Sequence, residues 1–551
     1  MSHLVKCAIS GEEFFVSDHE MRLRGMLDIM DTPTVLPKYR FQHLWAFWPH
    51  WTLHKRECNK TEKQIISVFS DKCPYPVWHK DQWFAHASPP KVEIDFDKPF
   101  FDQAWSLFQN CPIPHVFQNK NEQCEYTDDW YESRDCYLCH SGEKNEGTRY
   151  GYGLTSCKDC LYCVFSQFSQ WCIDCVNVSH SYECYYCLDV RDSNSCWFSY
   201  NLRNCSDCLF CFNLRNKRYC VGNKQFTPEQ YDSFVQEWWF DTIAGYQKWR
   251  EKFVQMMHDI AWIKADYIEL SENTTWNYLA HCKDAENSYM TTYHEDCCHD
   301  FWSGPGVKFT CEWVGTIGCQ MGYMVTMPIN CYQIRWSFMN LDCRFSDYIA
   351  YCAQGEELFG CCGLVRGHHC ILNAPYSAQE YTALKEKLRN HMIQTGEWWR
   401  FFPGHFAPNP YDESISGYHW SLSPWEQERR GFRVTSDNFD KNTSSYTPLV
   451  EIPKTPFDAT QDIVDKIFYD EKKQAPFQIL ALDVNFCRKL WVALTDRHYM
   501  RRIQENFSWM PFSGELRVTT CVKSGKKITT SWPSHYDKRI ISEEEYLKLN
   551  S

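Results

Sequence analysis

The sequence of 551 residues lacks the short motifs that identify the most common enzyme classes. It contains no Gly-x-Ser-x-Gly, no P-loop, no Gly-x-Gly-x-x-Gly and no His-Glu-x-x-His pattern. These absences remove the usual signatures of a serine hydrolase, a P-loop nucleotidase, a dinucleotide-binding enzyme and a zincin protease. No motif therefore favours catalysis.

Positive charge and long apolar runs are also scarce. The formal net charge is −13, which argues against a general nucleic-acid binder because such binding depends on Lys and Arg contacts to phosphate. No apolar run reaches the ~18 residues of a membrane-spanning helix, so we expect no membrane span. The first residues include no apolar segment of the secretory type. We therefore expect no signal peptide. We expect the protein to be located in the cytoplasm or to be assembled there, for example into a virion.

Cysteine, by contrast, is abundant, with 32 residues, and Trp occurs 24 times. In a secreted protein so many cysteines would indicate a disulfide framework, but without a secretory signal we expect mostly free thiols. A free Cys packs as a small apolar residue. The many aromatic side chains predict large contact surfaces between modules or with partners.

The cysteines repeat every twelve residues in the segment 157–216. Every third residue there is small or apolar, and the two residues between are mostly polar or aromatic. A period of three fits neither an α-helix nor an ordinary strand, and a short fixed repeat is typical of a solenoid, whose coils bury their core by stacking. The main column is Cys160, Cys172, Cys184, Cys196, Cys208 and Cys220, and a second column is Cys163, Cys175, Cys187 and Cys211.

We expect four inward positions in each twelve-residue coil and a narrow interior that accommodates Cys, Ser and Val but not Phe. The spacing resembles the twelve-residue β-helix of beetle antifreeze proteins, although their ice-binding Thr-x-Thr ladder is absent. The alternative explanation of Cys-x-x-Cys-x-x-Cys is a zinc or iron–sulfur site. Because Ser, Val and Leu occupy the same columns, the pattern favours a structural core over metal ligation.

A second, less regular repeat follows a helical segment. Its predicted columns hold Cys298, Cys319, Cys331, Cys343, Cys352, Cys361 and Cys370. Both repeats end alike, because the segment 219–231 aligns with the segment 369–381 at a constant offset of 150 residues. Capping boxes at Thr227 and Ser377 then predict the start of a helix after each repeat.

The two ends of the chain resemble each other. Cys7 and Cys58 each begin a knuckle of the zinc-ribbon type, Cys-x-x-Cys-Gly, but a hydroxyl residue stands where the second ligand is expected. Near the C-terminus, Phe477 and Cys521 have the same spacing as Phe14 and Cys58. Tetrahedral zinc needs four ligands, so we predict degenerate zinc-ribbon-like modules that fold without metal.

These patterns predict a mainly β fold with helical insertions, in which two β-solenoids of twelve-residue coils are each followed by a helix and flanked by ribbon-like α+β modules. In chain order the predicted segments are a degenerate zinc-ribbon-like module (1–90), a connector (91–120), the first solenoid (121–226), a helical segment (227–281), the second solenoid (282–376), a helix (377–394), an extended wrap (395–476) and a second ribbon-like module (477–551).

Several short motifs are spread along the chain: Cys7-x-x-Ser-Gly-Glu-x-Phe, Cys58 with Ile65-Ile66-Ser67, Asp95-Phe-Asp97-Lys-Pro-Phe, Tyr137-Leu138, Asn213-Leu-Arg-Asn-Lys-Arg-Tyr219, and Gly396-Glu-Trp with Phe401-Phe-Pro. With them the chain resembles, over essentially its whole length, an uncharacterised family of large Cys-rich proteins from uncultured small-genome bacteria and environmental sequences. Members of that family often keep complete Cys-x-x-Cys knuckles at both ends, which this chain lacks. The resemblance implies Cys-repeat solenoids and zinc-ribbon-like ends, and it implies no activity.

The densest group of metal-binding side chains in the sequence is His294, Cys297, Cys298 and His299. Thiolate and imidazole ligands suit zinc, so these four residues are the candidates for a metal site. Against zinc, adjacent ligands chelate poorly on a rigid backbone, and Cys298 falls in the inward phase of the repeat. We therefore expect no cofactor, with zinc as the alternative.

One outward edge of the first repeat is apolar over five coils. Its candidate interaction residues are Tyr185, Tyr186, Trp197, Phe198 and Phe210. Such a stripe exceeds the few hundred Å² that a soluble monomer usually exposes. We expect the helix after Thr227 or the segment 395–476 to cover it, which leaves the charged edges free for partners. An uncovered stripe would instead be a partner interface.

The leading functional hypothesis is a structural or interaction scaffold that binds a protein partner or assembles with itself, as in a virion or an envelope layer. The first alternative is a zinc-binding regulator or adaptor. The second is an enzyme with a site between the two solenoids. Stoichiometric zinc in the purified protein would favour the first alternative over the scaffold.

Overall fold

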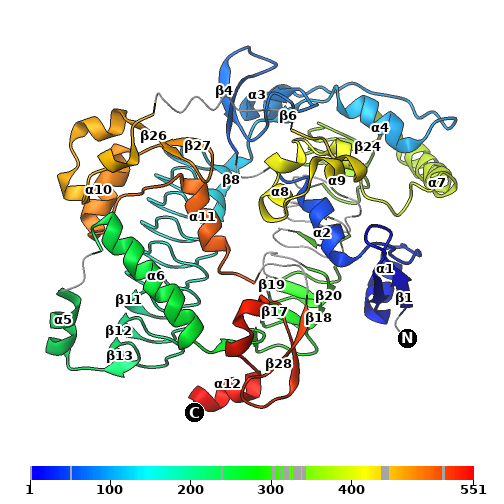
Figure 1. The fold of residues 1–551 in the computed structure, drawn as a ribbon. Coiled ribbons are helices and arrows are strands. Elements are labelled where there is room, and N and C mark those ends of the chain that lie inside the picture. Colours follow the sequence, from blue (N-terminus) through cyan, green and yellow to red (C-terminus); the bar gives the residue numbers. More distant parts are fainter. Residues whose placement is uncertain are drawn as a thin grey trace. The chain divides into compact units, whose positions relative to one another are not determined.

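The computed structural model describes residues 3–49, 52–236, 240–300, 306–310, 343–435, 446–511 and 516–550, together with a few positions between 313 and 337. The chain divides into two compact units, each discontinuous in sequence. The first unit contains residues 1–117, 266–436 and 513–517, and the second contains residues 118–265, 437–512 and 518–551. Many short strands and a set of helices make the fold a mixed α/β one (Figure 1). The predicted columns at Cys319 and Cys331 lie outside the described residues.

The second unit contains a stack of twelve-residue coils, which we call the first stack. Its pairing is parallel and joins each residue to the one twelve positions later, as in Tyr185↔Trp197 and Cys196↔Cys208. This pairing confirms the register predicted from the cysteine spacing. The strands of this stack are β7 (Gln118–Asn119), β8 (Asp128–Tyr131), β9 (His140–Glu143), β10 (Tyr152–Thr155), β11 (Asn194–Trp197), β12 (Ser206–Leu209), β13 (Arg218–Val221) and β14 (Lys224–Gln225).

The period of three has its origin in the backbone. Each inward residue is followed by a first outward residue in a parallel bridge and by a second outward residue with a positive φ, for example 50° at Asp159 and 56° at Tyr162. This left-handed conformation is uncommon for residues other than Gly. It is offset here because both outward N–H groups donate to neighbouring coils, Lys158 N to Ser169 O at 2.9 Å and Asp159 N to Glu146 O at 2.8 Å.

The interior of the first stack is closed by thiols and hydroxyls. Cys160, Cys172, Cys184, Cys196 and Cys208 are all 0% exposed, and the described cysteines are free thiols. Cys172 Sγ, for example, donates to the carbonyl of Gln170 at 3.5 Å, and inward N–H groups donate to the hydroxyl one coil earlier, as Ser193 N does to Ser181 Oγ at 3.2 Å. Cys and Ser suit these columns because they are small and satisfy polar groups that would otherwise be buried unpaired.

Both stacks end on an Asn that substitutes for the next coil. The amide of Asn223 accepts from Phe212 N at 2.7 Å and donates to Phe212 O at 2.9 Å. The amide of Asn373 makes the same pair of bonds with Cys362, each at 3.0 Å. Strands β14 and β25 (Ala374–Pro375) then turn back antiparallel, which protects the sheet edge. The two stacks therefore end with the same hydrogen bonds, as the 150-residue offset predicts.

A helix follows each exit, as predicted. After the first stack, α5 (Pro228–Gln236) begins where Thr227 Oγ1 accepts from Gln230 N at 3.3 Å. After the second, α7 (Ala378–Gln394) begins at a full capping box of Ser377 and Glu380. These bonds satisfy helix N–H groups that have no partner within the helix.

The first unit contains the second stack, whose register is less regular. The pairing offset is eleven residues at Ile268↔Leu279, twelve at Lys283↔Glu295 and thirteen at Glu295↔Lys308. Its strands are β16 (Ile268–Glu269), β17 (Trp276–Ala280), β18 (Lys283–Glu286), β19 (Ser288–Thr292), β20 (Glu295–Cys298), β21 (Trp313–Val314), β22 (Val325–Thr326), β23 (Glu356–Phe359), β24 (His368–Ile371) and β25.

Aromatic side chains pack helix α4 (Phe100–Phe108) onto the second stack. Phe100 lies 5.3 Å from Tyr348 and 5.5 Å from Phe359 between ring centroids. The helix has a carboxylate cap, because Glu397 accepts from Phe100 N at 2.8 Å and from Phe101 N at 2.7 Å. The Gly-Glu-Trp segment therefore stabilises a helix N-terminus, where a negative charge is favourable.

Four hairpins, each followed by a helix, make up the ends of the chain. The hairpins are β1 (His3–Lys6) with β2 (Glu13–Val16), β3 (His54–Glu57) with β4 (Gln64–Ser67), β26 (Ile467–Asp470) with β27 (Ala475–Gln478), and β28 (Arg517–Thr520) with β29 (Lys527–Thr530). The first and third hairpins are followed directly by α1 (Asp18–Met26) and α10 (Ala481–Leu490), and then by α2 (Pro37–Trp45) and α11 (Tyr499–Phe507). The second and fourth are followed by α3 (Lys80–His86) and α12 (Glu543–Asn550). The last two hairpins repeat the first two, so the predicted duplication is also present in the structure.

The remaining described strands and α-helices are β5 (Val77–Trp78), β6 (Ile113–Pro114), α6 (Ile243–Asp259), β15 (Ile263–Lys264), α8 (Ile415–His419), α9 (Pro424–Arg429) and β30 (Ile540–Ile541).

Candidate functional site

Three potential metal ligands meet inside the second stack. The ligand atoms of His294, Cys297 and Asp300 lie within 4.8 Å of one another, and all three residues are buried. They occupy every third position of the chain, so they are successive inward residues of one coil. Within the described part of the chain this is the one such group of His, Cys, Asp or Glu side chains.

Hydrogen bonds hold the three side chains in place. His294 Nδ1 lies 3.1 Å from Asp300 Oδ2, and Thr310 Oγ1 lies 2.8 Å from the same oxygen. Cys297 Sγ donates to the carbonyl of Glu295 at 3.2 Å, as inward thiols do throughout the first stack. Burial, followed by the nearby Asp300 carboxylate, raises the pKa of Cys297 well above its usual value. The thiol is therefore protonated unless a cation compensates its charge.

The structure separates the four metal candidates of the sequence. His294 and Cys297 face inward, and Asp300 joins them. Cys298 and His299 are outward residues, because Cys298 N donates to Thr310 O in the outward pattern and His299 has a φ of 54°. Cys298 is therefore not an inward residue, because the coil that follows it contains one residue more than twelve. Counting back from the later cysteines in steps of twelve residues could not predict this extra residue.

His299 binds the N-terminal module instead. Its Nε2 lies 2.9 Å from Glu20 Oε2 in α1, and Arg40 Nη1 lies 2.8 Å from Glu20 Oε1. Burial by itself would raise the pKa of Glu20, but Arg40 and His299 outweigh it and hold this pKa well below its usual range. This buried cluster docks α1 on strand β20, which is a structural role.

The aromatic wall of the first stack is covered. We define this wall as residues 161–162, 173–174, 185–186, 197–198 and 209–210, which include the five candidate interaction residues. Tyr186 packs on Phe253 of α6 at 5.4 Å, and Phe210 packs on Trp249 of α6 at 5.9 Å. Figure 1 shows that α6 runs across successive coils of the first stack, with α11 beside it. The predicted helical segment 227–281 therefore covers this wall through α6, its second helix. Helix α11 comes from neither of the two expected segments, and the wall is not an open partner interface.

A buried ion pair fastens α11 to the same wall. Arg502 Nε donates to Asp174 Oδ1 at 2.8 Å, and Asn506 Nδ2 and Tyr246 Oη donate to the same carboxylate. Burial would raise the pKa of Asp174, but the Arg502 guanidinium outweighs it and lowers this pKa. Sequence reasoning missed the pair, although Asp174 is the one charged residue in an otherwise apolar or aromatic wall.

The knuckle residues of the four end hairpins share one geometry. Cys7, Cys58 and Cys521 each accept, through Sγ, the N–H of the residue that precedes a helix, which is α2, α3 and α12 in turn, at 3.5, 3.3 and 3.3 Å. In the third hairpin Asp470 takes this position and accepts from His498 N at 3.0 Å. In the duplication Asp470 corresponds to Cys7, a match the sequence analysis missed. The knuckle cysteines join no group of three potential ligands among the described residues.

The knuckle of Cys521 predicts a pH-dependent stability. Burial would raise the pKa of Cys521, but hydrogen bonds from Ser524 and Ser542 outweigh it and lower the pKa to about 7. A lowered folded-state pKa stabilises the fold above the unfolded-state value and loses that effect as the pH falls through the folded-state value. Buried thiols with a raised pKa, such as Cys73 and Cys139, oppose this effect in the chain as a whole. We therefore expect the free energy of unfolding of the wild type, relative to that of Cys521→Ser, to rise between pH 7 and pH 9, measured by urea titration.

The chain supplies the matched variants for this experiment. Cys521→Ser should lose this contribution, because a hydroxyl carries no charge in this range. Cys521→Asp copies the side chain that already stands at Asp470, and it should stay stable without the contribution between pH 7 and pH 9. The other cysteines, including Cys7 and Cys58 with their lowered pKa values, contribute equally to the wild type and the variants. The same pH dependence in Cys521→Ser and in the wild type would contradict the prediction.

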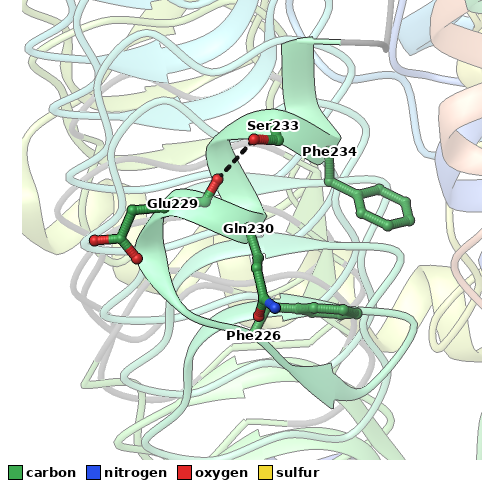
Figure 2. Close-up of a pocket in the computed structure, with 5 residues that line it drawn as sticks. All are labelled: Phe226, Glu229, Gln230, Ser233 and Phe234. Atoms are coloured by element: carbon green, nitrogen blue, oxygen red, sulfur yellow. Dashed lines mark hydrogen bonds between the residues drawn. The ribbon is translucent and has the colours of Figure 1, made fainter.

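An open hollow of about 470 Å³ lies beside α5. Figure 2 shows its lining, with the rings of Phe226 and Phe234 and the side chains of Glu229, Gln230 and Ser233. The Ser233 hydroxyl donates to the Glu229 carbonyl at 2.9 Å. With one carboxylate and no His or Cys, this lining offers no acid–base pair and does not favour a catalytic site.

Comparisons with known proteins do not add a family. No family model matches the chain, and no curated protein is significantly similar to it. None of the described helices is both long enough and apolar enough to cross a membrane.

Proposed function

We propose that the protein is a structural or interaction scaffold whose rigid parts are two β-solenoids. The observation that carries this proposal is the closed interior of the first stack. From Cys157 to Cys211 the inward positions hold only Cys, Ser, Val or Leu, and each coil is hydrogen-bonded to the next. Such a body has little conformational freedom and an interior filled by its own side chains, but it presents long, regular surfaces.

The outer surface of the first stack supports the same proposal. Two of its four walls are covered by the chain itself, the aromatic wall and the neighbouring wall with Val164, Val176 and Leu188. The other two walls remain exposed over several coils. Their exposed residues include Lys158, Gln167, Phe168, His180, Tyr182, Asp192, Asn194, Asn204 and Asn216. These open walls are the surfaces on which we expect a protein partner or a second copy of the chain to bind.

Site-specific photo-crosslinking tests this proposal. A photoreactive amino acid at Asn194 or Asn204, one on each open wall, should give crosslinks to another protein or to a second copy in the native cells. The same amino acid at Leu209, which is 0% exposed on the covered aromatic wall, should give only crosslinks within the chain. If Asn194 and Asn204 give no intermolecular crosslink where Leu209 gives its internal one, the scaffold proposal fails.

A further inference from the structure

We propose that the second stack holds one Zn²⁺ ion in its interior, bound by the imidazole of His294, the thiolate of Cys297 and the carboxylate of Asp300. The ion would stabilise the irregular part of this stack rather than perform chemistry, because His294, Cys297 and Asp300 are 1%, 0% and 0% exposed. The inference concerns a site in the first unit and does not rest on the scaffold proposal, whose observations come from the other unit.

The placement of the three residues in one coil brings their side chains together. Successive inward positions of one coil project into the interior from successive walls, so side chains at positions 294, 297 and 300 converge. The backbone of Asp300 has the inward pattern, since its N–H is directed to Ser288 Oγ, one coil earlier, at 3.4 Å. In the first stack the inward positions 157–211 carry neither His nor Asp. At this coil the pairing offset also rises to thirteen residues, which lengthens the coil around the two larger side chains.

The balance of charge at Asp300 also favours a bound cation. A buried carboxylate needs a compensating charge or must take up a proton. No Lys or Arg in the described residues forms an ion pair with Asp300; its recorded ion-pair partner is His294. Zn²⁺ with one carboxylate, one thiolate and a neutral imidazole has no net charge. Nitrogen, sulfur and oxygen donors of this kind are those that zinc prefers, and a water molecule would have to supply the fourth ligand of the tetrahedral site.

Binding changes the protonation of one ligand. The Cys297 S–H gives its proton to solvent, its hydrogen bond to the Glu295 carbonyl is lost, and a sulfur–zinc bond replaces them. His294 supplies a ring nitrogen, and the Asp300 carboxylate exchanges its hydrogen bond to the imidazole for the metal. Thr310 can still donate to the second carboxylate oxygen, because its Oγ1 lies 3.0 Å from Oδ1 and 2.8 Å from Oδ2.

Metal analysis and cobalt substitution of the full chain test the site. We expect one equivalent of zinc after purification without chelator. After the zinc is removed, one equivalent of Co²⁺ should give the ligand-field and thiolate charge-transfer absorption of a tetrahedral site. Cys297→Ser and His294→Gln should lose the charge-transfer band or shift it, with an affinity weakened by more than about 100-fold, since even outer-shell changes cost ~10–100-fold.

Cys282→Ser is the matched control. Cys282 is an inward thiol of the preceding coil with the same kind of hydrogen bond, Sγ to the Ala280 carbonyl at 3.4 Å, and it is not among the three ligands. This variant should keep the band and the affinity. If Cys297→Ser does not fold, the wild type decides: chelation should lower its thermal midpoint, and Co²⁺ should protect Cys297 from alkylation. Less than stoichiometric metal in the wild type, or equal loss in Cys282→Ser, would overturn the proposal.

Discussion

Replacing Trp197 and Phe210 together by aspartate is expected to unfold the second unit. Phe210 is 2% exposed and packs on Phe198 at 5.4 Å, and Trp197 packs on Phe240 at 5.3 Å. The double change removes two large apolar contacts and places one carboxylate beside Phe240 and one against α6. Burial of unpaired charge and loss of aromatic packing each cost several kcal/mol, so we expect a loss of at least ~4 kcal/mol out of a total of roughly 5–15 kcal/mol.

Urea unfolding followed by circular dichroism measures this effect, and the open walls supply the control. Gln167→Asp with Asn194→Asp introduces the same two charges on the open walls. Both positions are exposed and lie on different walls, so the two new carboxylates do not face each other. We expect this control to change stability by less than ~1 kcal/mol. Similar losses in the two variants would show that the aromatic wall has no special role.

The register of the first stack could be predicted because the sequence repeats the physical cause of the fold. Each inward position must be small and able to form hydrogen bonds, so Cys or Ser recurs and marks the phase directly. The exits at Asn223 and Asn373 could be recognised for the same reason, since one local geometry requires one side chain. At these positions the residue type alone indicates the position of the residue in the coil.

The second stack shows where this reasoning fails. One coil of the second stack contains an extra residue. Inward positions counted back from the later cysteines are therefore wrong by one residue on the N-terminal side of that coil, and the count predicts Cys298 as inward where the structure has Cys297. Asp300 was missed as a partner of His294 because an aspartate in a loop-like sequence is normally a solvated residue. Asp470 was missed because it replaces a thiol by a carboxylate, which preserves the acceptor but not the residue type.

The docking of helices on the stacks could be predicted only in part. The apolar pattern required a cover for the aromatic wall and favoured the helix after Thr227. The pattern could not supply α11, which comes from a segment more than three hundred residues away from Asp174. Pairs of this kind depend on tertiary packing, which local periodicity does not encode.

The ion pair between Asp174 and Arg502 should give the second large effect. Both side chains are buried, with exposed fractions of 3% and 7%, and the guanidinium also lies 4.0 Å from the ring centre of Tyr162. Arg502→Met keeps much of the volume but removes the guanidinium that is hydrogen-bonded to the carboxylate, and it leaves only the charge of Arg250 nearby. Removal of one member of a buried pair costs ~3–5 kcal/mol, so we expect a loss of this size in urea unfolding at pH 7.

The pH dependence and the double variant separate this explanation from a simple packing defect. In Arg502→Met, burial raises the pKa of Asp174, so the folded state takes up a proton more readily than the unfolded state and the defect shrinks as the pH falls from 7 to 5. The variant Asp174→Leu with Arg502→Met should recover most of the stability, since an apolar replacement of a buried pair is often neutral. Arg134→Ala, which breaks an exposed pair with Glu146, should cost less than ~1 kcal/mol. If the Arg502→Met defect does not change with pH and the double variant does not recover, the Arg502 side chain contributes through packing on Tyr162 and not through its charge.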